Sequence, residues 1–148
     1  MKGPLAHSRA RRRGAAPRGV AALEMALILP LLVTIVLGCV DFGRFAYTYI
    51  TVTNGAREGA AYASIWPIPG GKEGRAQWDA HIHAQVLTEM GSSFNPGEVT
   101  VQADDIPEGG VFRRVEVQVS YPFRTIVNWP LLPDELTLRR SVQMRVLD

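Results

Sequence analysis

A long hydrophobic stretch near the N-terminus dominates the pattern of the chain. Between Val20 and Val40, 17 of 21 residues are apolar. The four exceptions are Glu24, Pro30, Thr34 and Gly38. Such a run forms a helix of about 30 Å, which matches the hydrocarbon core of a bilayer. The pattern therefore predicts a transmembrane helix over residues 20–40, with a kink expected at Pro30.

The helical period continues beyond the apolar run, but there the helix becomes amphipathic. Apolar or small residues recur at spacings of three and four, at Phe42, Phe45, Tyr49, Thr53, Ala56, Ala60 and Ala63. This period predicts one helix over 20–64, whose last turns let another backbone approach closely. Ala56, Gly59 and Ala60 could pack against another subunit. Alternatively the stripe docks on a sheet of the same chain, which is the interpretation favoured for Ala60 and Ala63.

A segment rich in proline and glycine at 66–71 ends this helix, and a second helical pattern follows at 73–90. Apolar residues four apart mark the buried face of the second helix: Trp78, Ile82, Val86 and Met90, with Leu87 alongside. Gly91 is placed to cap the C-terminus of that helix.

The period then changes from helical to alternating. Apolar and polar residues alternate at 99–103, 115–121 and 136–146, which predicts three strands, with Pro122 ending the second. Arg140 alone breaks the apolar parity of the third strand. Three antiparallel strands with one apolar face need helices to cover it. The sequence therefore predicts an α+β fold, in which a long N-terminal transmembrane helix continues into a small head with a second helix and a roughly three-stranded antiparallel sheet.

Charge is distributed unevenly along the chain. The first 19 residues carry six basic side chains and no acidic one, whereas the remainder carries 10 basic and 14 acidic residues. Basic residues beside one end of a span keep that end in the cytoplasm. We therefore predict a basic cytoplasmic leader at 1–19, the span at 20–40 and an extracytoplasmic domain at 41–148. Because the adjacent span accounts for the charge of the leader, no nucleic-acid partner is predicted.

Glu24 is unexpected in this segment, because a carboxylate in lipid costs about 2.5–3.5 kcal/mol on insertion scales. Cleavage between Gly19 and Val20 would remove the leader and create an α-amine about one helical turn before Glu24. The carboxylate of one subunit could then pair with the amine of its neighbour, which offsets the burial cost and sets the register between subunits. This pattern resembles the class III signal of type IV pilins and pseudopilins. The alternative is a plain signal anchor whose glutamate lies near the interface and reaches water.

Three further segments are similar to the TadE-like family, whose members are pseudopilin-like proteins of tight-adherence (Flp) pilus assembly systems. These segments are LPLL at 29–32, DFGR at 41–44 and NGAREGAAYA at 54–63. The resemblance implies a pilin-like head, processing by a prepilin peptidase, and packing against other pilin-like subunits and pilus assembly proteins. It also implies a single-pass protein of the bacterial inner membrane with a periplasmic C-terminal domain.

The sequence offers no constellation typical of an enzyme or a cofactor site. His81 and His83 lie two apart and point to different sides of a helix, so they are not expected to share a metal. A predicted loop at 104–110 contains three acids, Asp104, Asp105 and Glu108. Their spacing is not that of an EF-hand, and a solvated hairpin loop is predicted. We therefore expect a non-enzymatic protein with no metal, cofactor or small-molecule substrate.

Two other membrane-bound functions fit the same sequence. VLGC at 36–39 resembles a bacterial lipobox, and cleavage there would leave residues 39–148 anchored by a lipidated Cys39. Glu24 and Pro30 interrupt its hydrophobic region, which disfavours this alternative; otherwise Cys39 is a small apolar residue of the span. The other alternative is an unprocessed bitopic envelope protein whose head binds a partner.

Overall fold

The computed structural model of the protein describes residues 18–66, 71–107, 113–130 and 132–146. The chain divides into two compact units within its first helix, one ending at Val36 and the other beginning at Leu37. Most of the predicted leader, residues 1–17, lies outside the described residues.

Helix α1 runs from Arg18 to Ile65 over 48 residues, close to the predicted limits. Every residue from 19 to 36 is exposed. Within the described part of the chain, α1 is the one helix that is long and apolar enough to cross a membrane. Pro30 lies inside the helix, and its carbonyl accepts a hydrogen bond from Thr34 Oγ1 at 2.8 Å. An apolar segment that faces outward on all sides is suited to a bilayer, as the sequence predicts.

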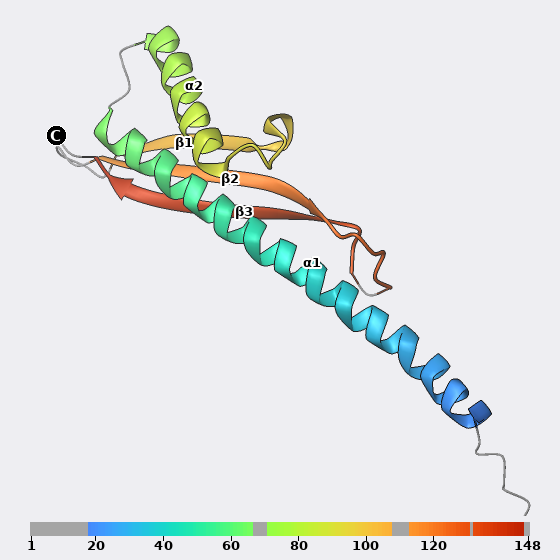
Figure 1. The fold of residues 1–148 in the computed structure, drawn as a ribbon. Coiled ribbons are helices and arrows are strands. Elements are labelled where there is room, and N and C mark those ends of the chain that lie inside the picture. The colour runs from blue at the N-terminus through green and yellow to red at the C-terminus, as the bar shows by residue number, and fades with distance from the viewer. Residues whose placement is uncertain (1–17, 67–70, 108–112, 131, 147–148) are drawn as a thin grey trace, which may run out of the picture. The chain divides into compact units, whose positions relative to one another are not determined.

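The strands form one antiparallel sheet in the order β1-β2-β3 (Figure 1). Their bounds are Thr100–Pro107 for β1, Arg113–Arg124 for β2 and Glu135–Arg145 for β3. The register pairs Val101 with Val119 and Val117 with Val142. Together with α1, helix α2 (Gly71–Met90) and a short 3-10 helix (Pro96–Glu98), this arrangement confirms the predicted α+β fold.

Alternation along β2 separates two faces of the sheet. Val115, Val117 and Val119 are 2%, 0% and 0% exposed and lie at the centre of the core. The side chains between them point to the other face, where Glu116 accepts hydrogen bonds from Ser141 and Gln143 of β3. Because that face is polar and satisfied across the strands, only the valine face needs helices to cover it.

Helix α2 begins two residues earlier than predicted and buries the predicted face. Its four marker residues are all less than 4% exposed: Trp78, Ile82, Val86 and Met90. Gly91 follows with a φ of 77° and donates its N–H to Leu87 O at 3.1 Å. A left-handed backbone conformation at this position favours glycine, which confirms the predicted C-terminal cap.

The parity break at Arg140 has a structural explanation. The Arg140 guanidinium lies 4.7 Å from the centre of the Tyr49 ring on α1. A guanidinium on an aromatic face is stabilised by the ring quadrupole, so a basic residue is accommodated on the apolar side of β3.

The predicted end of the second strand is wrong. Strand β2 continues through Pro122, which pairs in register with Thr137 of β3. The pairing of β2 with β1 ends at Ser120, so Pro122 lies where one side of β2 is an edge. A residue without an N–H is tolerated at an edge.

The predicted loop at 104–110 is also wrong in its first part, because β1 continues to Pro107. Asp105 pairs in register with Val115, and its carboxylate forms an ion pair with Arg113. This ion pair between the strands stabilises a hairpin end whose acidic residues have low strand propensity. Residues 108–110, including Glu108, lie outside the described residues.

Candidate functional site at the base of the head

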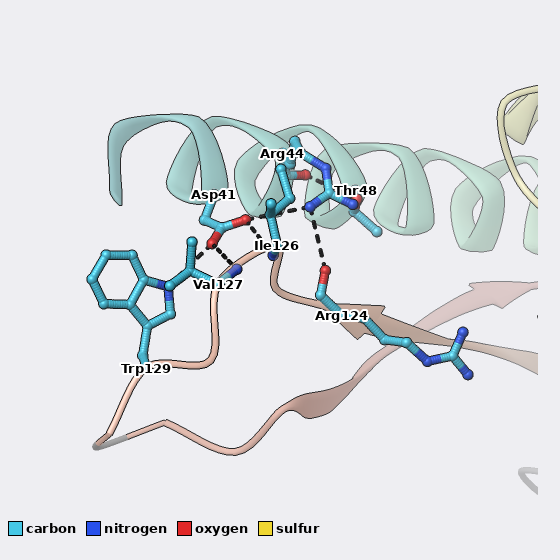
Figure 2. A network of polar contacts seen from close by, with 7 residues as sticks. All are labelled: Asp41, Arg44, Thr48, Arg124, Ile126, Val127 and Trp129. Carbon is cyan, nitrogen blue, oxygen red and sulfur yellow. Dashed lines mark hydrogen bonds and ion pairs between the residues drawn. The ribbon is translucent and has the colours of Figure 1, made fainter. Parts of the chain in front are cut away.

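A buried carboxylate lies on α1 directly after the predicted span. Asp41 is 5% exposed, and Figure 2 shows three donors of the β2–β3 connection around it. Asp41 Oδ1 accepts from the Ile126 N–H at 2.9 Å. Its Oδ2 accepts from Trp129 Nε1 at 3.1 Å and from the Val127 N–H at 3.4 Å. One side chain thus holds a segment that lies more than 80 residues away in the chain.

Arg44, one turn later on α1, completes this cluster. Its Nη1 lies 3.3 Å from Asp41 Oδ1 and donates to the Arg124 carbonyl, also at 3.3 Å. The guanidinium lies 5.5 Å from the centre of the Phe123 ring. Arg44 therefore connects the carboxylate of α1 to the last residues of β2. We call Asp41, Arg44, Ile126, Val127 and Trp129 the Asp41 clasp.

The clasp holds structure in place and is poorly suited to proton transfer. The hydrogen bond from the Ile126 N–H is the main cause that lowers the pKa of Asp41. Burial opposes this effect, while Trp129, Val127 and the nearby Arg44 charge add to it. A carboxylate saturated by donors and held ionised is a weak base, so the geometry points to a structural role. Within the described residues, no three His, Cys, Asp or Glu side chains could together hold a metal ion.

Arg124 connects β2 to Glu98 and to the start of β3 on the polar face at the same end of the sheet. Its guanidinium donates to Glu98 at 3.0 Å and to Glu135 at 2.9 Å. These hydrogen bonds, that to Glu98 first, raise the pKa of Arg124. Because Arg124 is exposed, the pairs add little to stability and mainly orient the connection.

An apolar groove of about 400 Å³ lies beside the clasp. Gly38, Phe42 and Phe45 of α1 line one side, and Trp129, Leu132 and Leu136 contribute to the other. Its walls are almost free of polar atoms apart from the satisfied Asp41 carboxylate. The groove is therefore suited to apolar occupants.

A comparison with protein families finds a match that lies within α1 and does not include the sheet. Residues 19–61 match the family model described as TadE-like protein. The chain carries a TadE-like segment. This finding confirms the resemblance inferred from the sequence. No match was found among curated proteins or among solved structures.

The TadE-like segment includes all the site residues predicted from the sequence. Gly19, Val20 and Glu24 lie in the first turns of α1 and are exposed. Glu24 forms no hydrogen bond or ion pair with another described residue. These three residues lie in the first two turns of α1, and none of them belongs to the Asp41 clasp.

The predicted packing residues lie in the core of the head. Ala56 and Ala60 are 0% exposed, and Gly59 is buried. A Cβ on Gly59 would lie 2.8 Å from Val86 Cγ2 and 3.1 Å from Val117 Cγ1. The close approach of α1 to α2 and β2 therefore requires glycine here, and within the head this face is covered by the chain itself.

Sequence reasoning missed the clasp. An aspartate directly after an apolar span, followed by arginine three residues later, was a signal for Asp41 and Arg44. Nothing local to Ile126 or Trp129 identifies them as its partners, because these contacts depend on where the β2–β3 connection returns to α1.

Proposed function

We propose that this protein is a membrane-anchored, pseudopilin-like subunit of a tight-adherence (Flp) pilus assembly system, and that it acts by helix packing rather than catalysis. The observation that carries the proposal is the TadE-like match at 19–61 on a helix long and apolar enough to cross a membrane. A family of pilus components and a single apolar helix together support a membrane-anchored, pilus-related protein.

The proposed mechanism begins with a prepilin peptidase that cuts between Gly19 and Val20. Cleavage removes the basic leader and leaves a positive α-amine on Val20. Glu24 of a neighbouring subunit pairs with this amine, which compensates the cost of a carboxylate in lipid and fixes the axial register. The exposure of Val20 and Glu24 supports this proposal, since both must reach another helix.

The proposed location is the bacterial inner membrane, with the N-terminus cytoplasmic and residues 41–148 in the periplasm. The six basic residues of the first 19 support this orientation. Inner-membrane lipid, the peptidase and other pilin-like subunits are the proposed partners.

Intact mass and N-terminal sequencing of the protein from membranes test the processing step. A start at Val20 is the expected result, and Gly19→Val should abolish it. A Cβ at Gly19 meets nothing within 4 Å, so loss of cleavage in this variant would reflect peptidase recognition rather than misfolding. A start at Cys39 with the mass of attached lipid would establish the lipoprotein alternative. A start at Met1 would favour the unprocessed bitopic protein.

Glu24→Gln tests the pairing step separately. The variant should insert normally but show reduced pilus output, because a neutral amide cannot form the ion pair. Glu58→Gln is the matched control, since it makes the same change at an exposed position of the same helix, outside the span. Normal pilus output from Glu24→Gln would contradict the pairing mechanism while leaving the anchor intact.

A further inference from the structure

The β2–β3 connection returns to the level of the predicted span. A Cβ built on Gly38 would lie 3.7 Å from Trp129 Cη2. Gly38 belongs to the last turn of the span predicted at 20–40, and Trp129 belongs to a connection of the head. A segment predicted to lie outside the membrane therefore lies beside helix surface predicted to lie inside it.

This connection exposes apolar side chains at the same end of the head. Ile126 and Leu132 are each 59% exposed, and Phe42 on α1 is 72% exposed. Phe42 and Leu132 line the apolar groove. Clustered apolar surface around an apolar groove marks an interaction site, whereas single exposed apolar residues do not.

Three donors of the connection are already paired. The N–H groups of Ile126 and Val127 and the indole N–H of Trp129 all donate to Asp41. Unsatisfied backbone donors make irregular segments costly in an apolar environment. The Asp41 clasp removes that cost at three donors, so the connection can approach hydrocarbon without leaving them unpaired.

We propose that the apolar side chains of Ile126, Trp129 and Leu132 dock into the lipid of the leaflet where the span ends, with lipid as the occupant of the apolar groove. The continuity of Gly38 and Phe42 with the span favours lipid over a soluble partner, because this surface begins within the predicted bilayer. Trp129 suits the boundary, since tryptophan prefers the interface between headgroups and acyl chains. The head is then held against the membrane at two points, the helix and the connection. This inference depends on insertion of residues 20–40 and not on a role in pili.

Fluorescent labels on single cysteines in the full chain, reconstituted in phosphatidylcholine vesicles, test the proposal. Ile126→Cys and Leu132→Cys, each in a Cys39→Ser background, place the label on the connection. Spin-labelled lipids with the quencher near the headgroup should quench both labels several-fold more than a label at Ile65→Cys. Ile65 is the matched control, because it is also 59% exposed but lies about 36 Å further along α1 than Asp41.

The native Cys39, labelled in the unchanged chain, reports the depth at which the span ends. Strong quenching at Cys39 together with quenching at 126 and 132 is the expected result. Quenching at Cys39 alone, with 126 and 132 resembling Ile65, would overturn the docking. Shielding of the labels at 126 and 132 from lipid, together with cross-linking between copies through the same cysteines left unlabelled, would assign the groove to a second copy, which also overturns the docking. No quenching at Cys39 would remove the insertion on which the proposal rests.

Discussion

The two halves of α1 place their apolar side chains in different surroundings. From 19 to 36 every residue is exposed, and the apolar side chains cover the whole helix surface. From 41 to 65 the buried positions fall on one stripe, where Val52, Ala56, Ala60 and Ala63 are 0% exposed. An apolar surface on all sides requires an apolar solvent, whereas one stripe requires a partner within the chain. One continuous helix thus combines a bilayer segment with a core segment.

Asp41 and Glu24, the first acid of each half, differ in the same way. Asp41 is buried and receives donors from Ile126, Val127, Trp129 and Arg44. Glu24 is exposed and has no hydrogen-bond or ion-pair partner among the described residues. The head satisfies the Asp41 carboxylate internally, while the proposed function requires a second subunit to pair with Glu24.

Paired valine truncations should show the largest difference between the two halves of α1. Val52→Ala removes buried apolar groups and leaves a cavity, so it should lower the unfolding free energy of the head by roughly 2–3 kcal/mol. Val33→Ala, at an exposed position of the same helix, should change it by less than about 0.5 kcal/mol. Urea unfolding in detergent micelles, followed by near-UV circular dichroism, measures both. Equal effects would show that the two halves are not distinct environments.

Replacing glycine by alanine should change the unfolding free energy by a smaller amount, with opposite signs at Gly59 and Gly43. Gly59→Ala brings a methyl group within 2.8 Å of the stiff Val86 side chain. Overpacking of about 1–3 kcal/mol, offset by about 1 kcal/mol of helix propensity, should leave a net loss of stability. Gly43→Ala meets nothing within 4 Å and should stabilise the helix by about 0.5–1 kcal/mol. A stabilising Gly59→Ala would contradict the close approach of α2 and β2.

Loss of the clasp should act locally more than globally. Asp41→Asn replaces one accepting oxygen by a donor, so the Ile126, Val127 and Trp129 donors cannot all stay paired. The connection lies at the end of the sheet and can open without unfolding the core. Hydrogen exchange should therefore speed up at the Ile126 and Val127 amides, with the Val117 amide unchanged as the internal control. Unchanged exchange at Ile126 would show that the clasp does not hold the connection.

Acid should produce the smallest effect, a loss of protection of the connection as the pH falls. The pKa of Asp41 is lower in the folded protein than in the unfolded chain. Its contribution is therefore complete above the unfolded pKa of about 3.9 and is lost as pH falls through the folded pKa. Protection factors at Ile126 should fall below about pH 4 in the native protein but not in Asp41→Asn. Local protection is the appropriate measurement, because the pKa of Glu116 is also lowered, first by Ser141, and adds to global acid sensitivity.

Much of the fold could be predicted because the spacing of apolar residues along the chain indicates which face of each helix and strand is buried. The faces of α2 and of β2 follow from spacings of four and of two, and tertiary packing uses those same faces. Strand ends could not be predicted as well, because Pro122 and Asp105 are poor strand residues in isolation. Pairing across the sheet places Pro122 at an edge and gives Asp105 an ion pair with Arg113, which overrides their propensities.

Local sequence is enough to identify the apolar span, the basic residues before it, the second helix and the parity of the strands, since each depends on neighbouring residues. Tertiary packing, by contrast, turns the small residues of α1 toward α2 and β2, and it makes Asp41 hold a connection whose Trp129 lies 88 residues later in the chain. A carboxylate can be satisfied by any donor that reaches it, and which donor does so depends on chain topology rather than on local pattern.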